Sequence, residues 1–428
     1  MQFKIEKMIY GGDGLARLPA DEHGSGKAAF IPFVLEGERV EAEITEQARS
    51  FVRAKLSHVI EPSPHRADPR CPYFARCGGC QYQHSDYEHQ LEVKAAVLKE
   101  NLRRIAKLEL KAELELHGSP AWNYRNRTRL KVQISPEFAI GYYRFNSHEL
   151  LAVEQCPISS PLINETIRLL WTLRDSAEPL QGLQEIELFA DDQDKSLLVE
   201  AHCSPETDSR SATQILKAVK ALSPAIAGVV AFAGSERAVP RRIASEGATE
   251  LTYRVDDLSF RVSAGSFFQV NRFLTGELVR LVTAGQSGKA ALDLYAGVGL
   301  FASVLKREFE HVIAVESSPT SYADLLYNSP PNGKAVKSMT EQFLVKAASK
   351  VKPDLVVVDP PRSGLGEKVV SAILDLGPAR IVYVSCDPAT LARDLQGLLG
   401  AGYQIKRAHL VDLFPQTYHL ESIFHLQR

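Results

Sequence analysis

The chain has 428 residues, 45% of them hydrophobic and 24% charged, so it is long enough for two or three domains with their own cores. Its 50 Lys and Arg residues nearly balance 52 Asp and Glu residues, which leaves a net charge of −2. This balance excludes a globally basic nucleic-acid binder but allows a local basic patch. Six cysteines in a chain of this length are too few for a disulfide scaffold.

The first residues, MQFKIEKMIYGG, contain no apolar stretch of the kind found in a secretory signal. Apolar runs such as residues 355–358 are too short to cross a bilayer. We therefore expect a cytoplasmic protein that does not act at a membrane, and we expect a monomer. In a reducing compartment, clustered cysteines are more often metal ligands or catalytic groups than disulfides.

Short stretches with alternating apolar residues, separated by glycine-containing turns, fill residues 1–58. This pattern predicts a small β-barrel of the OB type, although any small β-domain would share it. Residues 59–265 predict a central α+β domain. It begins with a proline-rich, charged linker at 61–72 and contains a helix over 86–107 that could pack on the next domain.

From residue 266 to 428, apolar strand-like runs alternate with helical stretches, as in AALDLYAG at 290–297 and PDLVVVDPP at 353–361. Strands that are apolar on both faces are typical of a mostly parallel sheet covered by helices. The C-terminal region therefore predicts a doubly wound, Rossmann-like α/β domain.

A turn containing Gly297 and Gly299 follows the strand that ends near Asp293, and a helix can begin just after it. Glu316 ends the next strand, 19 residues after Gly297, where an acid binds ribose hydroxyls in nucleotide-binding folds. Ala302 stands in place of a third glycine, which the dinucleotide pattern tolerates, but Val298 and Leu300 leave little phosphate-binding character, and this disfavours a pyrophosphate-containing cofactor. The pattern favours an adenosine cofactor such as S-adenosylmethionine.

Two later strands end in groups that can do chemistry. Asp359 ends one of them, and Cys386 ends the next, just before a predicted helix that should lower the pKa of the thiol. A buried, unreactive cysteine is the plain alternative. Glu421 lies in an apolar strand near the C-terminus, where an acid either faces solvent or has a role. A thiolate, a carboxylate and a methyl donor together suit methylation of uracil at carbon 5 through attack on carbon 6.

Several motifs, in this order and spacing, resemble those of the RNA uracil-5-methyltransferases. They are FFQVN (267–271), DLYAGVGLF (293–301), VES (315–317), DPPR (359–362), SCDPATLARD (385–394) and FPQTYHLES (414–422). Residues 1–58 resemble the TRAM domain of that family, an OB-like RNA-binding barrel. Segments 71–84, 124–132 and 141–158 resemble its central domain.

The resemblance implies that Cys386 is the nucleophile and Glu421 the proton acceptor. It also implies that S-adenosylmethionine is bound by four residues: Gln269, Tyr295, Glu316 and Asp359. Three positions depart from the pattern of many members: Ala296, Leu300 and Asp387. Of these, Asp387 matters most, because a carboxylate beside Cys386 would oppose formation of the thiolate.

Four cysteines form a second pattern: Cys71, Cys77 and Cys80 lie close together, and Cys156 lies far downstream. Four thiolates suit either zinc or an iron–sulfur cluster, and this three-plus-one spacing is closer to iron–sulfur usage. The resemblance also implies a [4Fe–4S] cluster, with zinc as the alternative.

Basic residues alternate along one predicted strand: Arg125, Arg127, Arg129 and Lys131. With aromatic residues nearby, this face could bind RNA phosphates and stack bases, although a solvated strand face would look the same. The target uridine would have to lie in a loop and flip into the pocket.

The sequence thus predicts a methyltransferase that forms 5-methyluridine in a structured RNA through a covalent adduct of the cysteine with uracil carbon 6. Ribosomal 23S RNA is the favoured substrate, and transfer RNA is the alternative. Methylation of an amino group is disfavoured because DPP is followed by Arg362 rather than an aromatic residue. A non-catalytic RNA-binding iron–sulfur protein is the remaining alternative.

Overall fold

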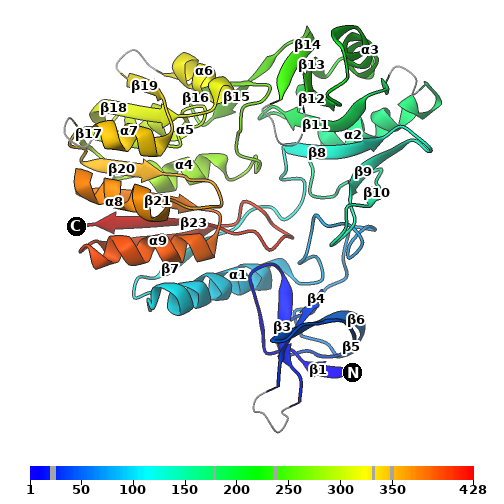
Figure 1. Ribbon diagram of the computed structural model, residues 1–428, viewed down its shortest axis with the longest axis horizontal. Coiled ribbons are helices and arrows are strands. Elements are labelled where there is room, and N and C mark those ends of the chain that lie inside the picture. The colour runs from blue at the N-terminus through cyan, green and yellow to red at the C-terminus, as the bar shows by residue number, and fades with distance from the viewer. Residues whose placement is uncertain (20–25, 177–179, 235–239, 330–332, 348–350) are drawn as a thin grey trace.

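The computed structural model describes residues 1–428 except 20–25, 177–179, 235–239, 330–332 and 348–350 (Figure 1). Its strands form an N-terminal, a central and a C-terminal sheet, together with a separate hairpin. Apart from residues 114–117, which join the C-terminal sheet, the three sheets follow one another along the chain, and each lies in its own part of the molecule (Figure 1).

The N-terminal strands lie where the alternating pattern predicts them, because every second side chain faces a small core around Ile31 and Val40. They form one six-stranded sheet in the order β1-β5-β6-β4-β3-β2. The strands are β1 (Gln2–Lys4), β2 (Lys7–Met8), β3 (Asp13–Arg17), β4 (Ala28–Pro32), β5 (Arg39–Gln47) and β6 (Phe51–Glu61).

The central sheet has seven strands in the order β10-β9-β8-β11-β12-β13-β14, and they pair antiparallel except for β12 with β13. Its strands are β8 (Arg127–Gln133), β9 (Ala139–Tyr143), β10 (Leu150–Ala152), β11 (Leu183–Ala190), β12 (Leu197–Cys203), β13 (Ile226–Ala233) and β14 (Arg241–Gly247). The helices α2 (Pro161–Trp171) and α3 (Ser209–Lys220) pack on it, and a 3-10 helix (Thr172–Ser176) follows α2.

The C-terminal sheet has eight strands in the order β19-β18-β17-β20-β21-β23-β22-β7. Its parallel strands are β17 (Gly288–Leu294), β18 (Phe309–Glu316), β19 (Gly333–Lys337), β20 (Leu355–Val358) and β21 (Arg380–Ser385). The strand β23 (Glu421–Gln427) runs antiparallel between β21 and β22 (Gln404–Val411). The predicted doubly wound fold therefore describes the strands β17 to β21. The strands β22 and β23 depart from it, because β23 pairs antiparallel with both of its neighbours.

Helices cover both faces of this sheet, which explains why its central strands are apolar throughout. They are α4 (Thr275–Thr283), α5 (Leu300–Leu305), α6 (Pro319–Asn328), α7 (Thr340–Ala347), α8 (Gly366–Leu376) and α9 (Pro388–Gly400). The hairpin of β15 (Glu250–Val255) and β16 (Leu258–Ser263) packs in the same core.

One segment that precedes the central sheet belongs to the C-terminal domain. The helix α1 (Tyr87–Asn101), its π-helical end (Leu102–Ala106) and β7 (Leu114–His117) pack against α9 and β22. The sheets thus divide the chain differently from the predicted boundaries at 59–265 and 266–428. Which domain this segment joins depends on residues about 300 positions away in the chain, as in the pairing of Leu114 with Ala408.

Candidate active site

The carboxyl ends of β17, β20 and β21 meet at one edge of the C-terminal sheet (Figure 1). Ligands bind at this edge in open parallel sheets, because the loops there leave space between strand and helix. Tyr295 follows β17, Asp359 follows β20 and Cys386 follows β21.

The turn after β17 depends on residues with positive φ. Gly297 has a φ of +55° and Gly299 of +95°, and Tyr295 adopts +65° although it has a side chain. Glu316, at the end of β18, accepts a hydrogen bond from the Gly297 amide at 2.9 Å and one from the Ser318 amide at 2.6 Å. Glu316, which is predicted to bind the ribose, therefore holds the glycine turn in place.

Three of the four predicted cofactor residues line a single small cavity: Gln269, Tyr295 and Asp359. The backbone of Gly297 and the exposed ring of Phe267 complete much of its wall. Glu316 lies behind this wall and contacts it through the Gly297 amide.

A further acid, Asp293, lies fully buried beneath the same turn. Its Oδ2 accepts a hydrogen bond from the Ala302 amide at 2.9 Å, while Oδ1 has no partner. Burial raises the pKa of this carboxyl to about 8, and the nearby Asp359 and Glu316 add to the rise. From the sequence, Asp293 was predicted only to lie near a strand end. An acid within an apolar strand is the sequence feature that could have identified it as a candidate site residue.

The pairing of β21 with β23 brings the proposed nucleophile to the proposed proton acceptor. The ladder ends at Ser385 opposite Ser422, and the Ser422 hydroxyl donates to the Ser385 carbonyl at 3.3 Å. Cys386 directly follows this last pair on one strand and Glu421 directly precedes it on the other, and the Glu421 carboxyl is near enough to raise the pKa of the Cys386 thiol. Glu421 is buried, and its Oε1 has no hydrogen-bond partner.

The prediction of a lowered pKa for Cys386 is wrong in this structure. Burial raises the pKa of the thiol to about 12, and the carboxyls of Glu421 and Asp359 add to the rise, against a smaller effect of Arg362. Burial likewise raises the pKa of Asp359 to about 7 and that of Glu421 well above its usual range. Three acidic groups share one buried site, so the helix that follows is not the dominant influence on the thiol.

Asp387 faces the helix rather than leaving its charge free beside the thiol. As the N-cap of α9, its Oδ1 accepts hydrogen bonds from the amides of Ala389 at 3.0 Å and Thr390 at 2.8 Å. This departure from the family pattern therefore has a structural role in the loop.

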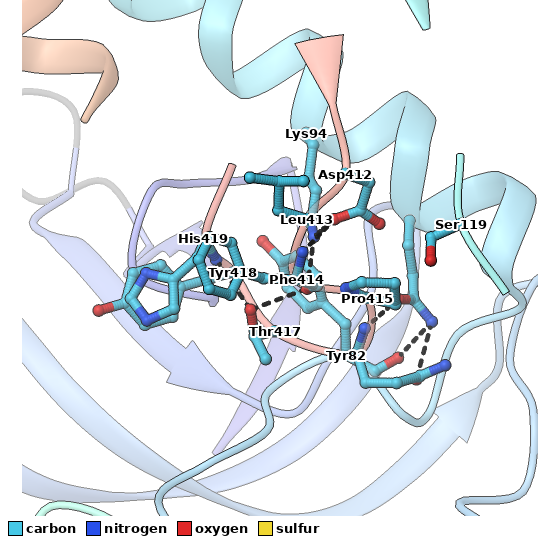
Figure 2. Close-up of polar contacts among 12 residues, drawn as sticks. Tyr82, Lys94, Ser119, Asp412, Leu413, Phe414, Pro415, Thr417, Tyr418 and His419 are labelled. Carbon is cyan, nitrogen blue, oxygen red and sulfur yellow. Dashed lines mark hydrogen bonds and ion pairs between the residues drawn. The ribbon is translucent and has the colours of Figure 1, made fainter. Parts of the chain in front are cut away.

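A buried ion pair holds the loop that leads from β22 into Glu421. Lys94, on α1, donates to Asp412 Oδ1 at 2.6 Å and to the Phe414 carbonyl at 3.0 Å (Figure 2). Both charged side chains are at most 1% exposed. The sequence alone does not predict this pair, because no local pattern links residues that are 318 positions apart.

The same loop is held by the segment that carries the first three cysteines of the cluster. The amides of Gln81 and Tyr82 donate to the Gln416 carbonyl at 3.0 and 2.9 Å. The side chain of Gln90 contacts Gln416 as well, through a buried hydrogen bond of 3.1 Å. Residues next to Cys80 thus support the approach to Glu421.

The four predicted metal ligands surround one cavity of about 230 Å³. All four cysteines are unbonded to one another and partly buried: Cys71, Cys77, Cys80 and Cys156. Burial raises the pKa of the Cys71 thiol, that of Cys77 to about 11, and that of Cys80 further, and the neighbouring thiols add to each rise. Four thiols around one cavity match the donor type of an iron–sulfur or zinc site. Their sulfur atoms are not among the groups of three or more described ligand atoms that lie within 4.8 Å of one another.

The strand next to the predicted basic strand carries carboxylates directly opposite two of its cations. Arg129 and Lys131 on β8 lie across from Glu187 and Glu185 on β11. Arg129 bonds Glu187 at 2.5 Å, and Lys131 forms an ion pair with Glu185. Both cations therefore already have partners within the protein.

Arg127 is the most deeply placed of these cations, with a side chain 12% exposed. It pairs with Glu187 and, at 2.9 Å, with Glu200, whose side chain is 4% exposed. Arg125 precedes the strand, and its Nε donates to the Arg127 carbonyl at 2.9 Å. RNA binding by this set stays a prediction, and the ion pairs support a structural function for Arg127.

Sequence comparison identifies two parts of the chain. Residues 4–57 match the TRAM domain, and residues 86–341 and 345–428 match the tRNA (uracil-5-)-methyltransferase family. The chain therefore belongs to the family of RNA uracil-5-methyltransferases.

Relatives of similar length support this assignment. The chain is 32% identical over 449 residues to the 23S rRNA (uracil(1939)-C(5))-methyltransferase RlmD of Shewanella amazonensis, covering 98% of this chain and 94% of that protein. It is 34% identical to an uncharacterized RNA methyltransferase of Aquifex aeolicus, with 99% and 97% covered.

A solved structure shares the whole fold. The tRNA (uracil-54, C5)-methyltransferase of Pyrococcus abyssi, in complex with S-adenosyl-L-homocysteine, has a TM-score of 0.76, 24% identity, and complete coverage of both chains. Among the described residues of this chain, no helix is long and apolar enough to span a membrane.

Proposed function

We propose that this protein transfers a methyl group from S-adenosyl-L-methionine to carbon 5 of a uridine in a structured RNA, most favourably 23S ribosomal RNA. The observation that supports the proposal is the pairing of β21 with β23, whose last pair adjoins both Cys386 and Glu421, together with the effect of Glu421 and Asp359 on the pKa of the Cys386 thiol. The RlmD relatives support ribosomal RNA as the substrate.

The cavity beside the glycine turn would hold the cofactor through Gln269, Tyr295 and Asp359, with Glu316 at the ribose. When bound, S-adenosyl-L-methionine supplies the methyl group to carbon 5 and a positive charge that favours the ionised forms of nearby acids.

The Cys386 thiol loses its proton to water, and the resulting thiolate forms a bond to carbon 6 of uracil. The electron pair of the C5–C6 double bond moves toward carbon 5 and the oxygen on carbon 4. After carbon 5 is methylated, the Glu421 carboxylate accepts the proton from carbon 5. The C–H electron pair restores the double bond, and the S–C6 bond breaks with its pair returning to Cys386. A flipped uridine from a loop would satisfy this geometry.

We further propose that Cys71, Cys77, Cys80 and Cys156 hold a [4Fe–4S] cluster, with zinc as the alternative. Protein purified without oxygen should carry about four iron and four sulfide per chain. About one zinc per chain, without sulfide, would overturn the cluster in favour of zinc.

Mass-spectrometric mapping of 5-methyluridine in RNA from a deletion strain tests the substrate. Loss of one 5-methyluridine from 23S ribosomal RNA, restored by the wild-type gene but not by a Cys386→Ala gene, is the expected result. Loss from transfer RNA alone would favour the alternative suggested by the Pyrococcus abyssi structure. An unchanged pattern in both RNAs, together with no methyl transfer to unmodified transcripts, would favour a non-catalytic RNA-binding protein.

A further inference from the structure

The N-terminal barrel reaches the catalytic loop through the tip of one hairpin. Tyr10 lies between β2 and β3, in a turn closed by a hydrogen bond from the Gly12 amide to the Ile9 carbonyl at 3.2 Å. Gly11 and Gly12 have φ values of +108° and +94°, which permit the tight turn. This conformation projects Tyr10 away from the barrel core.

The hydroxyl of Tyr10 donates a hydrogen bond of 3.2 Å to the backbone carbonyl of Cys386, 376 residues away. Cys386 lies between the last paired residue of β21 and the N-cap of α9, where the sheet no longer holds its carbonyl. Among the described residues, the Tyr10 hydroxyl is the hydrogen-bond donor to that carbonyl. The bond therefore fixes the peptide plane that follows the thiol.

The hairpin tip is also seated tightly against two other segments. The Tyr10 ring packs edge-on against Tyr418, with centroids 5.4 Å apart. A Cβ on Gly12 would come within 2.8 Å of the Gln81 Cβ and 3.5 Å of the Tyr418 Cβ. Gln81 in turn accepts a hydrogen bond from the Tyr418 amide at 3.4 Å. Tyr418 precedes Glu421 by three residues, so the tip contacts both loops that carry the proposed catalytic groups.

Burial raises the pKa of the Tyr10 hydroxyl above its ordinary value, with smaller contributions from Asp387 and Tyr418. The hydroxyl therefore stays protonated near neutral pH and remains a hydrogen-bond donor.

We propose that Tyr10 is a positioning residue for methyl transfer, so that the barrel forms part of the catalytic centre in addition to any contact with RNA. The inference rests on the proposed role of Cys386 as the nucleophile. Tyr10 acts by holding the Cys386 carbonyl and the Tyr418 loop, and it does not touch the reacting atoms.

Tyr10→Phe tests this directly, because it keeps the ring against Tyr418 and removes only the hydroxyl. We expect kcat to fall about five- to tenfold with KM for RNA changed less than twofold, measured on unmodified 23S transcript with radiolabelled S-adenosyl-L-methionine. The rate of covalent adduct formation in a single turnover should fall by the same factor.

Tyr403→Phe is the matched control. It removes another tyrosine hydroxyl bonded to a backbone carbonyl, that of Pro378 at 2.6 Å, from a buried residue that follows α9; Pro378 lies at the opposite end of β21 from Cys386. It should lower the melting temperature at least as much as Tyr10→Phe and leave kcat unchanged. An equal loss of kcat in both variants would overturn positioning by Tyr10, because a general loss of stability would then explain it.

Two other outcomes would also overturn the inference. A kcat within twofold of the wild type would show that the bond does not position the thiol. A raised KM with unchanged kcat would assign Tyr10 to RNA binding. A separate result would contradict the proposed function itself. If Cys386→Ala kept full activity, Cys386 would not be the nucleophile, whatever the result for Tyr10→Phe.

Discussion

Buried charges are handled in opposite ways on the central sheet and at the edge of the C-terminal sheet. On the central sheet, Arg127 lies between Glu187 and Glu200, so opposite charges offset each other. At the edge of the C-terminal sheet, burial raises the pKa values of Asp359, Glu421 and Cys386, and acidic neighbours add to the rise for Glu421 and Cys386. A buried charge with an opposite partner is typical of a structural ion pair. Buried acidic groups with raised pKa values instead mark a candidate functional site.

Removing the thiol should have the largest effect on this comparison. Cys386→Ala should lower methyl transfer more than ~10³-fold, because no other group at the edge can form the bond to carbon 6. Glu421→Gln should permit methylation but retain the covalent RNA adduct, which would appear as a slow band on a denaturing gel. A Cys386→Ala protein that still forms the adduct would show that another residue is the nucleophile.

Breaking the paired charges should affect stability instead. Arg127→Met leaves Glu187 and Glu200 buried without their common cation, so the free energy of unfolding should fall by about 3–5 kcal/mol in urea. Arg280→Met is the control, because Arg280 is 56% exposed beside Asp256 and should cost at most about 1 kcal/mol. Equal losses in the two variants would contradict the contrast drawn between the sheets.

The unpaired Asp293 should make stability depend on pH. Its folded-state pKa of about 8 lies above the ordinary value, so its contribution to stability is complete at acid pH and is lost as the pH rises from about 4 through 8. Asp293→Asn keeps an acceptor for the Ala302 amide and has no charge to bury. The variant should melt at a higher temperature than the wild type at pH 8.5, with no gain at pH 4; an equal gain at both would exclude titration as the cause.

The smallest effect concerns RNA contact by the central sheet. Arg129 has a side chain 49% exposed although it pairs with Glu187, so it is the β8 cation with most surface left for a phosphate. Arg129→Met should raise KM for the transcript about two- to threefold, with kcat unchanged, and should flatten the salt dependence of KM. An unchanged KM across salt concentrations would leave this face with a structural role alone.

Much of the fold follows from local patterns. Alternation placed the barrel strands, and uniformly apolar runs placed β17, β20 and β21, because strand periodicity reports directly which faces are buried. The glycine turn and the acid at Glu316 were readable for the same reason, since backbone geometry near Gly297 allows few residue types. The four clustered cysteines were also evident from spacing, and the structure brings them to one cavity.

Only the tertiary structure decided which distant residues meet. The sequence motifs identified Cys386 and Glu421 as candidates. The two residues come close together only because β23 pairs antiparallel with β21. The same packing reversed the expected effect on the Cys386 pKa, because burial among acids outweighs a helix N-terminus. It also brought Tyr10 to the catalytic loop and Lys94 to Asp412. Local sequence determines which element a residue joins, whereas burial and neighbouring charge depend on contacts hundreds of residues away.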